Sequence, residues 1–283
     1  MTEKLVEEVA MMRVQAPEPL KQFFEYIRYG YMIDNIVLII TGTLHERSVE
    51  DLLAKCHPLG MFDSVAMAGL TIAKNVSEIY RFVLVDTPLA AYFQDWNGIS
   101  EADLDELDIE IIRNTLYRAY LEDFNRFCEN LGGTTWEAMQ PLLEFEADRR
   151  TISITLNSLG TELSKDDRFR LYPRFGKLYP EGQALLARAD SQAQVRAVAD
   201  LHMVYRRIFA NAANDPRKTL EDAFFEYEVY LNKDSFNLQF GFAPFYSYVK
   251  LKEQEIRNII WISECVSQHQ KQQANHYIPL FER

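Results

Sequence analysis

Glycine, proline and cysteine are all scarce in this sequence. Of the 283 residues, 11 are Gly, 10 are Pro and 3 are Cys. So few turn-forming residues argue against β-sandwiches, β-barrels and glycine-rich phosphate loops. The three cysteines are far apart and form no C-x-x-C motif, so we expect no disulfide framework and a reducing compartment.

The sequence also lacks an excess of positive charge and any long apolar run. Its 42 Asp and Glu outnumber its 30 Lys and Arg, which gives a net charge of −12. Proteins that bind nucleic acid or anionic lipid normally carry a basic face, so we do not expect either activity. The densest apolar run, IVLII at residues 36–40, is much shorter than the roughly 20 residues of a membrane span. The charged start of the chain does not resemble a signal peptide, so we expect a soluble protein that meets membranes only through partners.

Helix-forming residues and helix start signals are abundant. In a capping box, Ser or Thr precedes an acid by three residues and satisfies the free N–H groups of the first helical turn. The pattern occurs at Ser48/Asp51, Ser100/Asp103, Thr134/Glu137, Ser164/Asp167 and Thr219/Asp222. Breaks are expected at residues 96–100, 131–135 and 211–218. In the second of these, Gly132 and Gly133 are typical of a helix C-cap. The sequence therefore predicts an all-α fold.

One segment allows two interpretations. The β-branched alternation of residues 151–156 (TISITL) favours a strand. A wider window favours a helix, because apolar residues recur at three- and four-residue spacing. The residues on this stripe are Leu142, Phe145, Arg149, Ile152, Leu156 and Leu159. We expect a helix, in which Arg149 lies within the apolar stripe and must be paired if it is buried.

A cluster of charges lies in the same segment. Glu144, Glu146 and Asp148 are followed directly by Arg149 and Arg150. A catalytic acid pair would need two carboxylates in different environments within a cleft. The alternative is a structural ion-pair joint between helices. Glu146 precedes the two arginines by three and four residues, which are salt-bridge spacings on a helix, so we favour the joint.

Candidate metal ligands are sparse. Residues 100–110 (SEADLDELDIE) are rich in acids, but acids after an N-cap are favoured by the helix dipole without any metal. Cys56-His57 lacks the further ligands of a zinc site. Nucleotide-binding, hydrolase and metalloprotease motifs do not occur in the sequence. We therefore expect no cofactor and no metal.

A weak repeat links three windows. Asp34-Asn35, Arg149-Arg150 and Arg257-Asn258 each precede a β-branched or aliphatic pair, at intervals of about 110 residues. Each window is followed 22 to 24 residues later by a proline. The prolines are Pro58, Pro173 and Pro279. Such a period predicts three similar helical lobes.

Several long motifs resemble the d subunits of eukaryotic vacuolar-type proton ATPases. The motifs are YGYMIDNIVLIITGTLHERS, KCHPLGMF, LVDTPLAAYFQD, IEIIRNTLYRAYLEDF, LGGTTWEAM, LEFEADRRTISITLNSLGTELSKDDR, KTLEDAFFEYEV and YVKLKEQEIRNIIWISECVSQ. The resemblance runs from about Met12 to the end of the chain.

The resemblance implies a fold and a role. Members of this family are all-helical, with three similar lobes around a pseudo-threefold axis that form a funnel-like cap. The cap lies on the proteolipid c-ring, receives rotor stalk subunits D and F, and adjoins membrane-sector subunit a. The resemblance implies a non-catalytic adaptor that couples ATP hydrolysis to proton pumping, peripheral on the cytosolic face of vacuolar or other acidic endomembranes.

We expect lobes at residues 1–110, 111–215 and 216–283. The resemblance implies that the first lacks an N-terminal part of the family, and that the third is completed by helices from elsewhere. The structural charge joints expected in the three lobes are Asp34, Asn35, Glu144, Glu146, Asp148, Arg149, Arg150, Glu253, Glu255 and Arg257.

Two other functions stay open at this point. One is a soluble all-helical scaffold unrelated to the pump. The other is a carboxylate-based helical metalloenzyme, which would use Asp103, Glu106, Asp108 or Glu146.

Overall fold

The structure is a computed structural model that describes residues 1–61, 87–93, 106–270 and 272–280. Within these ranges the chain forms helices and turns without any β-strand, so the all-α prediction is confirmed. No helix in these ranges is both long enough and apolar enough to cross a bilayer. The chain divides into two compact units: Met1–Val9 with Asn125–Arg283, and Ala10–Phe124.

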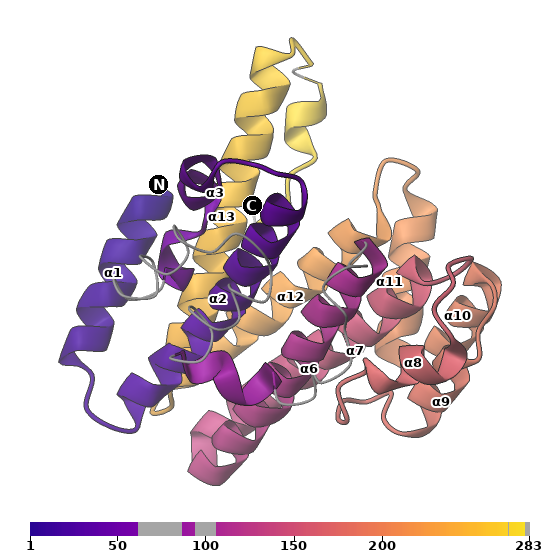
Figure 1. The fold of residues 1–283 in the computed structure, drawn as a ribbon, viewed down its shortest axis with the longest axis horizontal. Helices are drawn as coiled ribbons and strands as arrows, with labels where there is room; N and C mark the ends of the chain where they lie inside the picture. The colour runs from indigo at the N-terminus through magenta and orange to yellow at the C-terminus, as the bar shows by residue number, and fades with distance from the viewer. Residues whose placement is uncertain (62–86, 94–105, 271, 281–283) are drawn as a thin grey trace. The chain divides into compact units, whose positions relative to one another are not determined.

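Long helices dominate both units (Figure 1). The longer ones are α1 (Thr2–Gln15), α2 (Leu20–Leu44), α6 (Glu106–Leu131), α7 (Gly133–Asn157), α11 (Met203–Asn214), α12 (Leu220–Phe236) and α13 (Ala243–Ser267). The shorter ones are α3 (Val49–Lys55), α8 (Lys165–Arg170), α9 (Glu181–Ala187) and α10 (Gln192–Ala199). Single 3₁₀ turns form η1 (Pro58–Gly60), η3 (Pro88–Phe93) and η5 (Gln273–Asn275).

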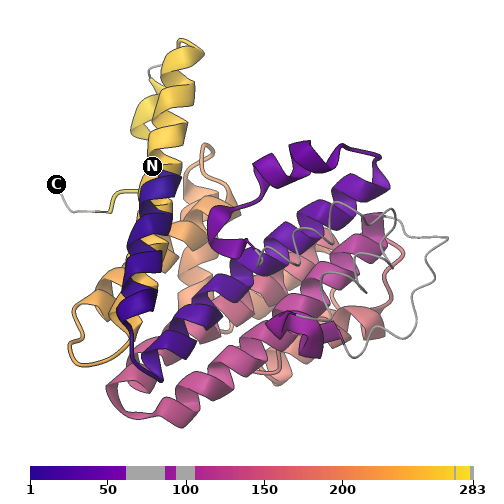
Figure 2. The ribbon, with the colours of Figure 1, turned by 60° about the vertical axis from the view of Figure 1, so that its left-hand side comes forward.

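In the unit of residues 10–124, α2 packs antiparallel to the part of α6 that ends at Phe124 (Figure 2). Phe23 contacts Phe124 near one end of the pair, with ring centroids 5.5 Å apart. Further along, the Tyr117 hydroxyl donates to the Gly30 carbonyl at 3.1 Å. Most of α2 is buried, because apolar side chains occur on nearly all its sides.

In the other unit, α7 packs against α9, α10, α12 and α13. It buries residues on several faces, so the single apolar stripe expected from the sequence is too narrow. The first residues of α1 belong to this unit, where the Tyr248 hydroxyl of α13 donates to Glu8 at 2.5 Å. The helix expected over residues 151–156 is confirmed.

The helix caps show which local predictions hold. Ser48, Ser164 and Thr219 each accept the backbone N–H of the acid three residues later, as predicted. The prediction for Thr134 is wrong, because α7 begins at Gly133 and its N-cap is Gly132, with φ of +62°. Gly132 also ends α6, since its N–H bonds to the Cys128 carbonyl, as the predicted C-cap requires. Ser100 lies outside the described residues.

The three cysteines are all buried. Cys56, Cys128 and Cys265 are 8%, 0% and 4% exposed, and none forms a disulfide. Burial raises the pKa of the Cys56 and Cys128 thiols above their usual range. A structural role as small apolar side chains follows from this burial.

Candidate functional site

The charges predicted as a joint form an ion-pair cluster on α7. The Glu146 carboxylate accepts hydrogen bonds from Arg149 Nη2 at 2.6 Å and from Arg150 Nε at 2.7 Å. Less than a fifth of each of these side chains is exposed. We call Glu146, Arg149 and Arg150 the α7 joint.

The α7 joint is electrostatically tied to neighbouring helices. Burial would raise the pKa of Glu146, but Arg149, Arg150 and Lys250 of α13 hold it down at about 2. Burial and the charge of Glu146 raise the pKa of the Tyr246 phenol well above its usual value. Glu146 is therefore ionised at neutral pH, and its field acts on groups of α13.

Asp148 is the fully buried carboxyl of the cluster. It is 0% exposed and accepts hydrogen bonds from the N–H groups of Lys177 at 2.8 Å and Leu178 at 3.1 Å. The Tyr205 hydroxyl of α11 donates a third at 2.5 Å. Burial raises the pKa of Asp148 to about 6, although these three hydrogen bonds oppose the shift. Arg149 is paired with Glu146 and keeps 19% of its side chain exposed, whereas Asp148 is enclosed.

Gly176 directly precedes the Lys177 and Leu178 amides that Asp148 binds, and the site has no room for a larger residue. Gly176 has φ of +110°, a conformation that side chains disfavour. A Cβ at this position would also collide with the Asp148 carboxylate. Glycine is needed here for both reasons.

Two asparagines hold the backbone in the same way. The Asn35 side chain donates to the His57 carbonyl at 2.9 Å and accepts from the His57 N–H at 2.7 Å. The Asn258 side chain donates to the Ile278 carbonyl at 2.7 Å and accepts from the Ile278 N–H at 3.3 Å. His57 and Ile278 each directly precede a proline.

Three long helices thus carry the same kind of contact. Asn35 of α2, Asp148 of α7 and Asn258 of α13 each bind the backbone of a segment 20 to 30 residues later in the chain. We call these three residues the backbone clamps. Asn35 and Asn258 lie in windows of the sequence repeat, and Asp148 directly precedes the window that begins at Arg149.

The other predicted residues have weaker or more local contacts. Asp34 is exposed, and Glu144 accepts from Gln140 at 2.8 Å. On α13, Glu253 lies 3.5 Å from Lys250. Glu255 lies 2.7 Å from Lys252 on the same helix.

Arg257 was expected to be a charge joint, but it stacks on an aromatic ring. Its guanidinium lies 4.2 Å from the centroid of Phe225 on α12. The neighbouring residue, Asn258, makes the polar contact in this part of α13.

Sequence reasoning missed Tyr205, Asn258 and Arg168 as buried polar contacts. Arg168 is 4% exposed and donates to the carbonyls of Ser158, Ala187 and Ala189. Asn258 aligns with Asn35 in the sequence repeat, and this was a usable signal. Arg168 had no such signal, because it lies in no window of the repeat, and the Asp148 partner of Tyr205 is 57 residues away.

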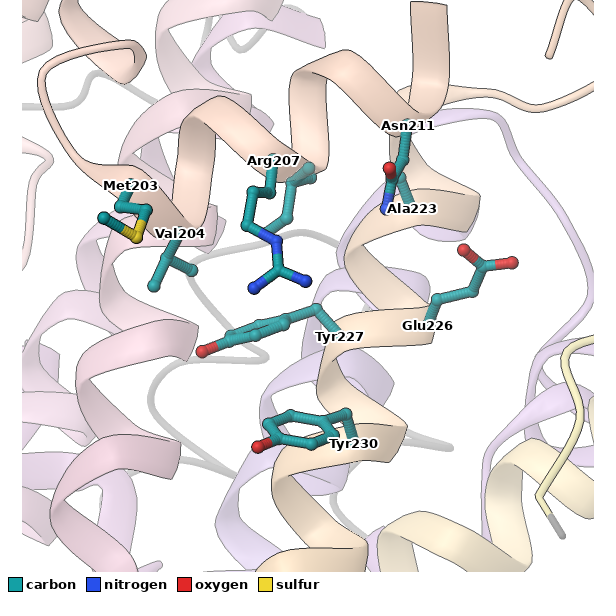
Figure 3. A pocket seen from close by; sticks show the side chains of 9 residues that line it. Met203, Val204, Arg207, Asn211, Ala223, Glu226, Tyr227 and Tyr230 are labelled. Carbon is teal, nitrogen blue, oxygen red and sulfur yellow. The ribbon is translucent and has the colours of Figure 1, made fainter. Parts of the chain in front are cut away.

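A groove of about 390 Å³ lies between α11 and α12 (Figure 3). Arg207 and the rings of Tyr227 and Tyr230 point into it (Figure 3). Its lining is Met203, Val204, Arg207, Ile208, Asn211, Ala223, Glu226, Tyr227 and Tyr230. The groove is mainly apolar and contains none of the predicted site residues.

Among the described residues, no group of three His, Cys, Asp or Glu side chains is placed to hold a metal ion. Glu146, one of the candidate metal ligands, is engaged by two arginines. Asp103 and the side chain of Glu106 lie outside the described part of the chain. The carboxylates of the α7 cluster take part in ion pairs and in hydrogen bonds to backbone and side-chain groups.

Comparison with known proteins gives a consistent result. The model of the ATP synthase (C/AC39) subunit family matches residues 1–277. The chain is 57% identical to a V-type proton ATPase subunit d of Dictyostelium discoideum, over 99% of the chain and 78% of that protein. It is 45% identical to the subunit d of Saccharomyces cerevisiae, over 98% of the chain and 79% of that protein. A probable subunit d of Oryza sativa subsp. japonica is 56% identical over 97% of the chain and 77% of its own length.

Proposed function

The chain belongs to the ATP synthase (C/AC39) subunit family, alongside d subunits of V-type proton ATPases, and we propose that it is a non-catalytic rotor adaptor of such a pump. In this role it joins the proteolipid c-ring to the central-stalk subunits D and F, near membrane-sector subunit a. It thereby couples ATP hydrolysis to proton transport on the cytosolic face of acidic endomembranes. The observation that carries the proposal is the likeness to subunit d across nearly the whole chain.

The packing of the described residues suits an adaptor that transmits torque. Such a part has to stay stiff under load, and dense packing provides stiffness. α7 is buried on several faces, and Asp148 ties it to α11 and to residues 177–178. Each of these contacts joins elements that are distant in the sequence, so the unit resists shear between its helices.

The backbone clamps support a division into three lobes at residues 1–110, 111–215 and 216–283. Each clamp would fix a long helix to the segment that closes its lobe. The proposed charge joints would keep the helices of each lobe in register.

A pull-down from host membranes tests the function. The full chain carries a C-terminal tag, the membranes are solubilised in mild detergent, and the co-purified subunits are quantified by mass spectrometry. We expect the c-ring and subunits D and F to be recovered in constant ratio to the tagged chain. An untagged strain is the control, and recovery of the tagged chain alone would contradict the proposal.

Coupling is tested in vesicles that lack the chain. Adding it back should restore ATP-driven acidification together with ATP hydrolysis. A soluble scaffold unrelated to the pump would change neither activity.

A further inference from the structure

The last residue of α12 and the loop that leads to α13 expose several apolar side chains. Phe240 is 94% exposed, Phe236 is 51% exposed and Leu238 is 46% exposed. Clustered exposed apolar side chains commonly mark interaction sites. We call residues 236–242 the aromatic loop.

The aromatic loop is held in a strained conformation. Phe240 has φ of +67°, which is unfavourable for a residue with a bulky side chain. The Thr134 hydroxyl donates to the Phe240 carbonyl at 2.9 Å, and the Phe242 N–H donates to the Thr135 hydroxyl at 3.1 Å. Gly241 fits closely against the backbone of these threonines. The start of α7 therefore fixes a loop that points a phenylalanine away from the protein core.

The charges around the aromatic loop indicate what it binds. Residues 235–249 include no Asp, Glu, Lys or Arg. Three exposed acids lie in the helix turns next to the aromatic loop and next to Thr134 and Thr135. They are Glu129, Glu137 and Asp234. The same turns contain one base, the half-buried Lys233. An apolar tip with an acidic surround complements an apolar pocket with a basic rim.

A bilayer is a poor match for the same surface. Membrane-bound segments combine apolar residues with Lys and Arg, because cytosolic leaflets are anionic. Here the surround is acidic and the net charge of the chain is −12. The charge pattern favours a protein partner.

We propose that the aromatic loop docks on another subunit of the pump, with the Phe240 side chain in an apolar pocket that has a basic rim. This inference rests on the proposed function. Phe240 then acts as an interface anchor, and Thr134 and Thr135 position it.

Site-specific photocrosslinking tests the contact directly. p-Benzoylphenylalanine replaces Phe240 in the full chain, the pump is purified and irradiated, and the adduct is mapped by mass spectrometry. The same residue at Phe169, an aromatic that is 43% exposed on α8, is the matched control. We expect an adduct from position 240 on a different pump subunit, at a peptide with apolar residues and Lys or Arg. An adduct only on phospholipid, an adduct on a second copy of this chain, or no adduct would overturn the proposal.

Substitutions provide a second test that does not depend on the unnatural residue. Phe240→Gly relieves the backbone strain, so its melting temperature should equal or exceed that of the unsubstituted chain. Its binding to pump membranes depleted of the chain should fall about ten-fold or more, as for an interface anchor. Phe240→Ala should weaken binding similarly, while Phe169→Ala should not. Equal binding of Phe240→Gly and the unsubstituted chain would refute the docking, whereas failure of the unsubstituted chain to bind would refute the proposed function.

Discussion

At the scale of single residues, Asp148 shows how enclosure changes a carboxyl group. Three hydrogen bonds favour its ionised form, yet burial prevails and raises the pKa of Asp148 to about 6. The enclosing groups come from residues 177–178 and from Tyr205. The sequence placed Asp148 among other charges, but helical spacing carries no information about what lies across the helix. For this reason the spacing indicated the pairing of Arg149 with Glu146 but not the enclosure of Asp148.

The raised pKa of Asp148 predicts a specific pH dependence of stability. Between its ordinary pKa of 3.8 and about 6, the folded state binds more protons at this group than the unfolded state. The free energy of unfolding should therefore fall by up to about 3 kcal/mol as the pH rises through this window, and level off above it. Asp148→Asn should remove this slope from urea-unfolding curves recorded at a series of pH values.

A confounding group titrates nearby with the opposite sign. The pKa of Glu146 is lowered to about 2, so its stabilising effect is lost only as the pH falls below its ordinary value of 4.5. Subtracting the Asp148→Asn curve from that of the unsubstituted protein cancels this contribution. A difference that stays flat from pH 4 to pH 6 would show that Asp148 does not titrate in this range.

At the scale of elements, the α7 joint predicts a cost for breaking one ion pair. Arg149→Met leaves the shielded Glu146 carboxylate with Arg150 as its remaining arginine. We expect a loss of about 1–3 kcal/mol in the free energy of unfolding, measured by urea titration, and weaker assembly into the pump.

The double variant Glu146→Gln/Arg149→Met provides the control for Arg149→Met. It also removes the negative charge of Glu146, which has lost one of its two arginines, and should recover part of the lost free energy of unfolding. Unchanged stability and unchanged assembly of Arg149→Met would rule out a structural role for the joint.

The clamp on α13 predicts a local effect. Asn258→Ala removes the acceptor of the Ile278 N–H, and this amide is buried. Hydrogen exchange of the Ile278 amide should accelerate about ten-fold or more, because the segment opens more easily. Asn275→Ala, at an exposed position of η5, should leave the exchange rate unchanged. Equal rates in both variants would mean that Asn258 does not hold the segment.

Helix starts illustrate which elements the sequence can predict. Caps at Ser48, Ser164 and Thr219 involve atoms within three residues, so the local pattern is sufficient. Thr134 has the same pattern, but its hydroxyl bonds to the Phe240 carbonyl, 106 residues away. A local rule fails where a distant segment competes for the same group.

At the scale of the whole molecule, the helical class and the family followed from composition and long motifs. The repeat of about 110 residues singled out the windows that contain Asn35 and Asn258. A repeat identifies equivalent positions even when the residues that they contact are unknown. The individual partners could not be predicted, since they depend on which segments meet after folding. The division into three lobes stays a prediction, and the helices of the described ranges group into two compact units.

The burial of the three thiols has a consequence for redox chemistry. Thiolates are the reactive form of cysteine, and neither Cys56 nor Cys128 ionises readily while the protein is folded. Oxidants and alkylating reagents therefore reach these sulfur atoms only after the surrounding helices separate. The native fold thereby protects these thiols from oxidation. The rate at which a reagent modifies each of them would report how often the helices around it separate.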